Sequence, residues 1–104
     1  MRSKLICVDM DGTLCDTEEW TIDGCRLAHP RQPIIDATNR AYLENFIIIY
    51  TARRDELMPI TLEWLRRNNV RYHAISNQKI PTDIYVDDKM FSLKEFEEYG
   101  KGTN

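Results

Sequence analysis

The sequence predicts an α/β fold in which a parallel sheet of about four strands lies in a three-layer arrangement, and three observations support this. Short apolar runs alternate along the chain with amphipathic segments that have helical spacing. Two of the runs, residues 5–9 and 46–50, are apolar at nearly every position, which is typical of strands buried on both faces. The strands end in polar residues, as expected where parallel strands present groups to a ligand.

The first strand, residues 5–9, leads into an unusually acidic turn, Asp9-Met10-Asp11-Gly12-Thr13. Two carboxylates at the tip of a buried strand are costly unless a cation or several hydrogen-bond donors neutralise them. Gly12 allows the backbone to turn sharply, and Thr13 can donate from its amide and its hydroxyl. This turn is therefore the first candidate for a functional site.

Residues 15–32 show no sustained period, and Gly24 and Pro30 interrupt them. We expect a loop or short hairpin that lies over the strand ends as a flap. Trp20 is its largest side chain, and it either packs the flap onto the body or faces a substrate.

The remaining chain is expected to form helices at residues 33–43, 55–67 and 92–99 and strands at residues 46–50, 70–75 and 83–86. Pro33 suits the first position of a helix. Pro59 is tolerated only near a first turn, so the second helix is expected to begin nearer Met58. Ser92 and Glu95 form a capping box at the start of the last helix.

Right-handed crossovers and a central first strand give a Rossmann-like sheet with the order 3-2-1-4, the strands being numbered along the chain. In such a sheet the carboxyl ends of the strands lie along one edge. Polar groups from four segments are then expected to meet there: Asp9, Thr51, Lys79, Asp87 and Asp88. With Asp11, this predicts a site of four acids, a hydroxyl and a lysine.

Composition fits one soluble domain over residues 1–104, with 42% hydrophobic and 30% charged residues. No apolar run approaches the length of about 20 residues that crosses a bilayer, and no signal peptide is evident, so we expect a cytoplasmic protein without a membrane partner. The net charge of −3 argues against a general nucleic-acid binder and leaves local basic patches open. The three cysteines show no metal-type spacing and are expected to be reduced thiols.

The segment VDMDGTL resembles the first motif of the haloacid dehalogenase (HAD) superfamily of phosphotransferases, which is Asp-x-Asp-Gly-Thr after a hydrophobic strand. IIIYT is similar to the second motif, Lys79 to the third and IYVDD to the fourth, in chain order. The resemblance extends from residue 4 to about residue 91. Within the superfamily the chain is most similar to the small HAD phosphatases without a cap domain. The segments between its predicted strands leave no room for a cap. Ile80 is a departure, because proline often follows the lysine in those relatives and here Pro81 comes one residue later.

The resemblance implies a Mg²⁺-dependent phosphomonoesterase with an aspartyl-phosphate intermediate. Asp9 would attack phosphorus, and the Asp11 side chain would transfer protons to the leaving oxygen and from water. Metal ligands would be the carboxylates of Asp9, Asp87 and Asp88 and the main-chain carbonyl of Asp11.

Thr51 and Lys79 would complete the catalytic set, holding and neutralising the phosphoryl. The backbone around the strand ends would bind further phosphate oxygens, at Met10, Gly12, Thr13 and Ala52. Arg53 precedes a helix N-terminus, where a cation is disfavoured, so we expect it to face an anionic group of the substrate.

The acidic chain favours a small phosphorylated metabolite as substrate, a nucleotide or a sugar phosphate. The alternative is the end of a macromolecule, a polynucleotide or a polysaccharide. Two rivals belong to a different class of function. A receiver-like signalling domain is disfavoured because the third strand ends in Ile75-Ser76-Asn77 without an acid. A non-hydrolytic phosphate-binding module is disfavoured because the set of acids is complete. A homo-oligomer is left open.

Overall fold

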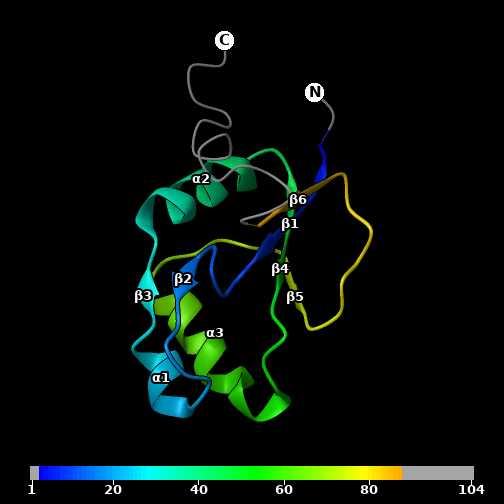
Figure 1. Ribbon diagram of the computed structural model, residues 1–104. Helices are drawn as coiled ribbons and strands as arrows, with labels where there is room; N and C mark the ends of the chain where they lie inside the picture. The colour runs from blue at the N-terminus through cyan, green and yellow to red at the C-terminus, as the bar shows by residue number, and fades with distance from the viewer. Residues whose placement is uncertain (1–2, 88–104) are drawn as a thin grey trace.

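A four-stranded parallel sheet organises residues 3–87, which are the residues that the computed structural model describes (Figure 1). Its strands are β1 (Leu5–Asp9), β4 (Phe46–Tyr50), β5 (Ala74–Ser76) and β6 (Ile84–Val86), in the order β5-β4-β1-β6. This is the order 3-2-1-4 predicted for the four sequence strands, with β1 in the centre. β1 pairs with β4 along its whole length, from Leu5 opposite Phe46 to Asp9 opposite Tyr50.

The third strand of the sheet begins later than predicted, at Ala74 instead of residue 70. Val70 is instead part of the turn that caps the preceding helix, because its N–H donates to the Leu65 carbonyl over 3.0 Å. The chain joins the sheet only at His73, whose N–H donates to the Ile47 carbonyl over 2.9 Å.

Helices α2 (Gln32–Tyr42) and α3 (Met58–Arg67) cover one face of the sheet, close to their predicted bounds. A 3₁₀ turn, η1 (Asp55–Leu57), precedes α3, so the helix does begin at Met58. The crossovers β1–α2–β4 and β4–α3–β5 step in the same direction, and right-handed connections therefore place both helices on the same face. The shared core is drawn from the sheet and both helices, with Ile6, Val8, Ile47, Ile49, Ile34, Ile35, Trp64 and Leu65 among its members.

The opposite face of the sheet is crossed by residues 77–83, which connect β5 back to β6 without a helix (Figure 1). From β5 to β6 the chain crosses the sheet in the direction opposite to the two helical crossovers. A right-handed connection in that direction must pass over the other face of the sheet. Cys7, Ile48 and Tyr85 alternate with the core residues along their strands and so belong to this face. The described residues thus have the predicted layered α/β fold, and no cap domain interrupts them.

The segment predicted as a flap, residues 15–32, contains a small antiparallel pair, β2 (Cys15–Asp16) with β3 (His29–Pro30). A short helix, α1 (Ile22–Arg26), lies between the two strands and packs against α3. The Thr21 hydroxyl caps this helix by accepting from the Gly24 N–H over 2.9 Å. Trp20 is 36% exposed, so most of its surface is covered by the surrounding chain.

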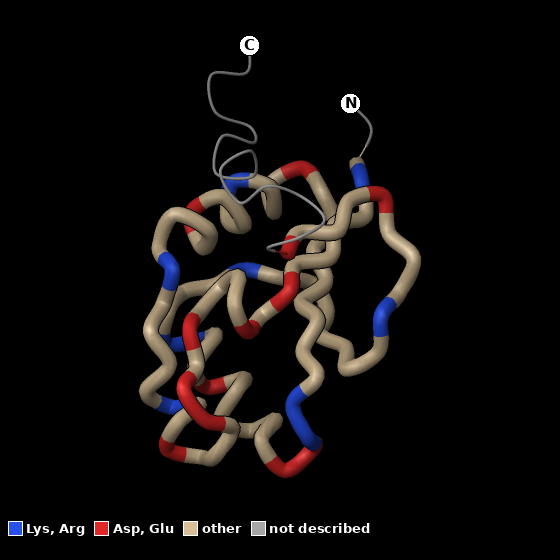
Figure 2. The backbone as a smooth tube through the Cα atoms, viewed as in Figure 1, with Lys and Arg blue, Asp and Glu red and all other residues tan. Residues whose placement is uncertain are grey.

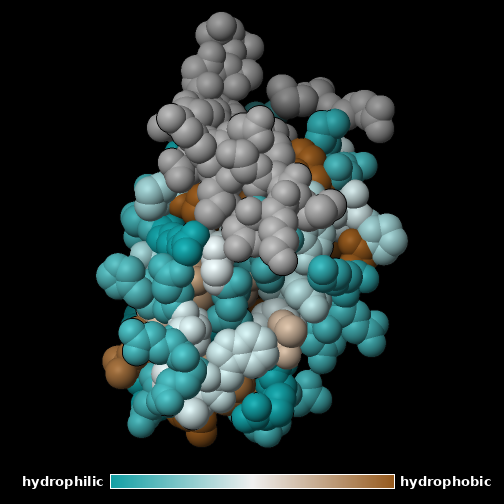
Figure 3. Space-filling model, in the orientation of Figure 1, coloured by the Kyte–Doolittle hydropathy of each residue, from teal (hydrophilic) through white to brown (hydrophobic). Residues whose placement is uncertain are grey.

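Acidic residues are concentrated along the flap (Figure 2), which includes Asp16, Glu18, Glu19 and Asp23. Two of these four acids are paired at the surface, Asp16 with Arg31 and Asp23 with Arg26. Figure 3 shows a mostly hydrophilic face with separate apolar spots. The three cysteines are buried and form no disulfide, as predicted.

The predicted helix at residues 92–99 and the acid Asp88 lie outside the described residues. Within residues 3–87 no helix is both long enough and apolar enough to cross a membrane.

Candidate active site

The predicted polar groups meet at the carboxyl end of the sheet. Asp9 is the last residue of β1, Thr51 follows β4, and Asp87 follows β6. Lys79 comes from the segment that crosses the sheet, and its charge, like those of Asp11 and Asp87, acts on Asp9. Four segments that are distant in the sequence therefore contribute to one site, and the fifth predicted group, Asp88, is not among the described residues.

Asp9 is a half-buried carboxyl at the centre of this site, and its pKa is raised from 3.8 to about 6. Burial is the largest cause, because it disfavours the charged form, and the carboxylates of Asp87 and Asp11 add to it. The Met10 N–H, which donates to Asp9 Oδ1 over 3.0 Å, and the Lys79 ammonium act in the opposite direction. The Lys79 ammonium and the Met10 N–H therefore do not offset the effects of burial and of the neighbouring carboxylates on the pKa of Asp9.

The turn after β1 is fixed by its own backbone. The Met10 carbonyl accepts from the N–H groups of Thr13, Leu14 and Cys15, at 3.1, 2.9 and 3.2 Å. Gly12 has φ +87°, a conformation that side chains with a Cβ rarely adopt, which explains why glycine follows the second acid.

The amides expected to bind phosphate are therefore partly engaged already. Those of Met10, Gly12 and Thr13 donate to carbonyls of the protein, of Tyr50, Cys15 and Met10 respectively. The amides of Asp11 and Ala52 donate to no described residue. These two are the N–H groups that an anion at the ends of β1 and β4 can use.

The Thr13 side chain carries a further unused donor. Its Oγ1 is buried and has no hydrogen-bond partner within the described part of the chain. An unpaired buried hydroxyl costs about 1–3 kcal/mol, a cost that a bound ligand or water removes. The orphaned hydroxyl is consistent with a site built to hold a polar ligand.

Asp11 and Arg53 form a bidentate ion pair beneath the site. Arg53 Nε donates to Asp11 Oδ2 over 3.1 Å, and Arg53 Nη2 donates to Asp11 Oδ1 over 2.8 Å. The Arg53 side chain is 0% exposed, and that of Asp11 is 19% exposed. Two fixed hydrogen bonds to a buried guanidinium hold the orientation of the Asp11 carboxylate.

Two threonines are further hydrogen-bond partners of Arg53, whose Nη2 also lies 3.8 Å from Cys15 Sγ. Thr61 of α3 accepts from Arg53 Nη1 over 2.9 Å, and Thr17 of the flap accepts from Arg53 Nη2 over 3.0 Å. The Thr17 hydroxyl in turn donates to Asp11 Oδ1 over 2.6 Å. Arg53 therefore points inward, which differs from the outward, substrate-facing side chain that we expected, because the flap and α3 supply partners for its donors.

Thr17 and Thr61 were not among the predicted site residues. Thr61 lies on the apolar stripe of α3, and a polar residue on a buried stripe is a signal that a partner must exist in the core. Thr17 lies in the acidic flap, where no pattern marks it.

Thr51 and Lys79 occupy the positions expected from the sequence. The buried Thr51 Oγ1 accepts from the Arg53 N–H over 3.2 Å, which leaves its own proton available to a ligand. The Lys79 ammonium lies 5.2 Å from the centre of the Tyr85 ring and 5.8 Å from that of Tyr50. Cation–π contacts of this kind hold the ammonium near the end of β1 while leaving it accessible.

The donor set fits Mg²⁺ in kind. Residues 3–87 contain no group of three or more His, Cys, Asp or Glu side chains placed to hold a metal ion. Mg²⁺, however, keeps several waters and is commonly bound through one or two carboxylates. Asp9 and Asp87 offer hard oxygen ligands, and the Asp11 carbonyl accepts no hydrogen bond from a described residue.

No family model matches the sequence, and no curated protein matches it. A chain in the structure of the Pnkp1/Rnl/Hen1 RNA repair complex is similar with a TM-score of 0.62 and 14% identity, over 95% of this chain and 30% of that chain. A chain in a second structure of the Pnkp1/Rnl/Hen1 complex has a TM-score of 0.62 and 15% identity, over 100% of this chain and 36% of that chain. This chain thus spans about a third of the length of those chains. At this identity the likeness establishes a shared fold.

Proposed function

We propose that this protein is a HAD-type, Mg²⁺-dependent phosphomonoesterase in which Asp9 is the nucleophile. The observation that carries the proposal is the different surroundings of the two acids of one turn. Asp9 faces the open edge of the sheet among Asp87 and Lys79, whereas Asp11 is held by Arg53. Two carboxyls in distinct environments can take distinct roles, one in nucleophilic attack and one in proton transfer.

The residues act in sequence. A carboxylate oxygen of Asp9 attacks phosphorus, and the bond to the leaving oxygen breaks. The leaving oxygen takes a proton from Asp11, which must enter this step in its protonated form and leaves it as the carboxylate. Asp11 then takes a proton from water, whose oxygen attacks the aspartyl-phosphate and releases Asp9 and phosphate. The Thr51 hydroxyl and the amides of Asp11 and Ala52 bind the phosphoryl oxygens, and Lys79 offsets their charge. Bound Mg²⁺ supplies further neutralisation of the acids and the phosphoryl group.

Arg53 serves this chemistry as a positioning residue. Its guanidinium contacts Asp11, Thr17 and Thr61, so it acts through Asp11 and not through the substrate. Because Thr17 belongs to the flap, the orientation of Asp11 depends on the flap being in place.

A small phosphorylated metabolite is the preferred substrate class. The four acids of the flap work against the approach of a long polyanion, since within residues 3–87 only two of them are paired with arginine. The second candidate is the phosphorylated end of a polynucleotide, which the two similar RNA repair structures favour.

Hydrolysis of a simple aryl phosphate tests the proposal. We expect Mg²⁺-dependent release of phosphate by the parent, abolished by chelator and by Asp9→Asn. Asp16→Asn is the matched control, because Asp16 is an exposed acid of the flap that pairs with Arg31. Equal rates for Asp9→Asn and the parent, or full activity in excess chelator, would contradict the proposal.

Substrate class is tested by rates on nucleotides, sugar phosphates and an oligonucleotide with a terminal phosphate. A preference for the oligonucleotide that falls steeply with salt indicates the second candidate. A silent binding module would bind phosphate esters without turning over any of them.

A further inference from the structure

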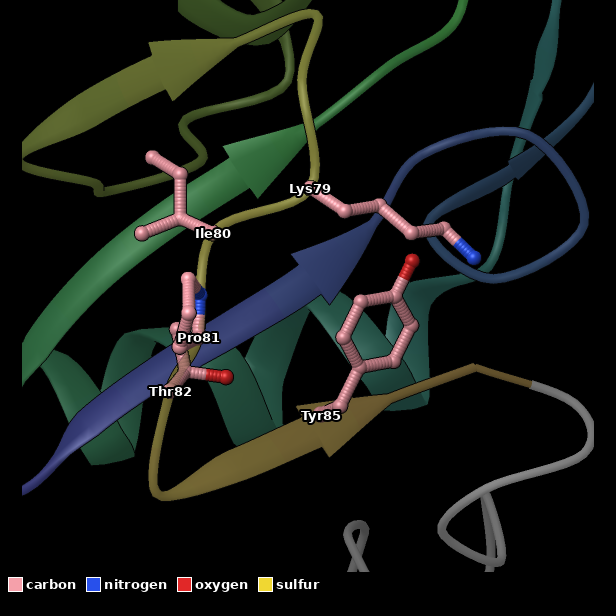
Figure 4. A pocket seen from close by; sticks show the side chains of 5 residues that line it. All are labelled: Lys79, Ile80, Pro81, Thr82 and Tyr85. Atoms are coloured by element: carbon pink, nitrogen blue, oxygen red, sulfur yellow. The ribbon is translucent and has the colours of Figure 1, made fainter.

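A cavity of about 390 Å³ lies beside the candidate active site, between residues 77–83 and strand β6 (Figure 4). It is lined by Lys79, Ile80, Pro81, Thr82 and Tyr85. It lies on the sheet face that the helices leave uncovered. Its volume is within the range of pockets that hold small organic molecules, about 300–1,000 Å³.

The walls of the cavity are mainly apolar and partly flat. The Tyr85 ring offers a planar surface, and Pro81 and Ile80 add aliphatic ones. Thr82 contributes the polar group of the interior. Its hydroxyl donates to the Ile84 carbonyl over 3.0 Å, so its lone pairs remain free to accept from a ligand N–H.

The cavity opens toward the site of phosphoryl transfer. Figure 4 shows the Lys79 side chain extending past the end of β1 and the Tyr85 hydroxyl pointing toward that side chain. The Lys79 ammonium lies over the Tyr85 ring, and its charge acts on Asp9. Lys79 thus belongs both to the cavity and to the site.

We propose that this cavity binds the nucleobase of a nucleoside phosphate whose phosphoryl group is held at Asp9 and Lys79. The inference rests on the proposed function and chooses between its substrate classes. A base can stack on Tyr85 and present an N–H to Thr82, whereas a sugar in the same place would leave its hydroxyls against Ile80 and Pro81 without partners. The base has the same chemistry in a free nucleotide and at the end of a polynucleotide.

The kinetic test compares adenosine monophosphate with ribose 5-phosphate, which has a hydroxyl group in place of the base. The parent is expected to have a kcat/KM at least about tenfold higher for the nucleotide, in keeping with the energy of one base–aromatic stack. Tyr85→Leu should remove most of that ratio, while any effect that it has through the Lys79 ammonium should lower the rates on both compounds alike. Tyr85→Phe should retain the ratio. Tyr72→Leu is the control, because Tyr72 lines a separate cavity.

A binding measurement separates this inference from the proposed function. Both compounds are titrated onto Asp9→Asn, with and without the Tyr85→Leu change. Tighter binding of the nucleotide that depends on Tyr85 supports the inference even if neither compound is hydrolysed. Equal affinities for the two compounds, or equal losses on both in Tyr85→Leu, would overturn it.

The source of the base is decided by an oligonucleotide with a terminal phosphate. If Tyr85→Leu lowers kcat/KM for the oligonucleotide and the free nucleotide alike, the cavity accepts a polynucleotide end. If it lowers only the value for the free nucleotide, the ligand is a metabolite.

Discussion

Replacing Asp9 with asparagine should make the metal-free protein more stable at neutral pH. Asp9 has a pKa of about 6 in the folded protein against 3.8 ordinarily, chiefly because it is buried and then because Asp87 and Asp11 are near. The folded state therefore binds a proton more tightly than the unfolded state does. The stability that this group contributes is fully present below pH 3.8, falls as the pH rises from 3.8 to about 6, and is lost above about pH 6.

The magnitude follows from the same values. A rise from 3.8 to about 6, at 1.36 kcal/mol for each pKa unit, corresponds to a cost of about 3 kcal/mol for the ionised carboxylate at pH 7. Because Asp9 is only half-buried, we expect Asp9→Asn to recover about 1–3 kcal/mol of unfolding free energy. That corresponds to a rise in Tm of roughly 4–20 °C for a domain of this size. The asparagine oxygen can still accept from the Met10 N–H.

Urea unfolding of the parent and Asp9→Asn between pH 4 and pH 8, with chelator present, measures this difference. The gain should be largest above pH 6 and should vanish toward pH 4. Asp16→Asn is the control of opposite sign, because the hydrogen bond from Arg31 lowers the pKa of Asp16. That exposed pair is worth about 0–1 kcal/mol, present at neutral pH and lost in acid. A loss of stability in Asp9→Asn at pH 7, or a gain that does not vary with pH, would refute the reasoning.

Four further perturbations probe the same site. Mg²⁺ at 100 times its Kd should stabilise the folded parent by about 2.7 kcal/mol and so raise its Tm, and it should raise the Tm of Asp9→Asn much less. Equal shifts in Tm for the two proteins would show that Asp9 does not bind the metal. Arg53→Met leaves the Asp11 carboxylate without its partner and should cost about 3–5 kcal/mol in urea unfolding. The milder Arg53→Lys should lower kcat equally for singly and doubly anionic esters. A decrease in activity confined to doubly anionic esters would instead show that Arg53 binds the substrate. Gly12→Ala should cost about 1–2 kcal/mol from its φ of +87°, because no atom lies within 4 Å of the added Cβ; an unchanged urea midpoint would contradict this.

The sheet could be predicted because its signals are local. The apolar runs of β1 and β4 are long enough to be read as buried strands, and Pro33 and Pro59 mark where α2 and α3 begin. The handedness of crossovers then fixes the strand order, which carries the groups at the strand ends to one edge.

Other features depend on contacts that no local pattern encodes. Arg53 turns inward because of Thr61, eight residues later, and Thr17, 36 residues earlier. The helix α1 has only five residues, too few to show a helical period. The start of β5 is set by pairing with β4, in which Ala74 lies opposite Ile48. In each case tertiary packing decided the outcome.

The central claim, that Asp9 carries a phosphoryl group during turnover, is tested most directly by trapping that intermediate. The parent is mixed with a phosphate ester and Mg²⁺, quenched in acid within one turnover, digested and analysed by mass spectrometry. We predict a phosphorylated, hydroxylamine-labile aspartyl peptide that contains Asp9, absent from Asp9→Asn and enriched in Asp11→Asn if the loss of the base slows hydrolysis of the intermediate more than its formation. Burst-phase release of the leaving alcohol with no label on that peptide, or a label on another residue, would contradict the claim.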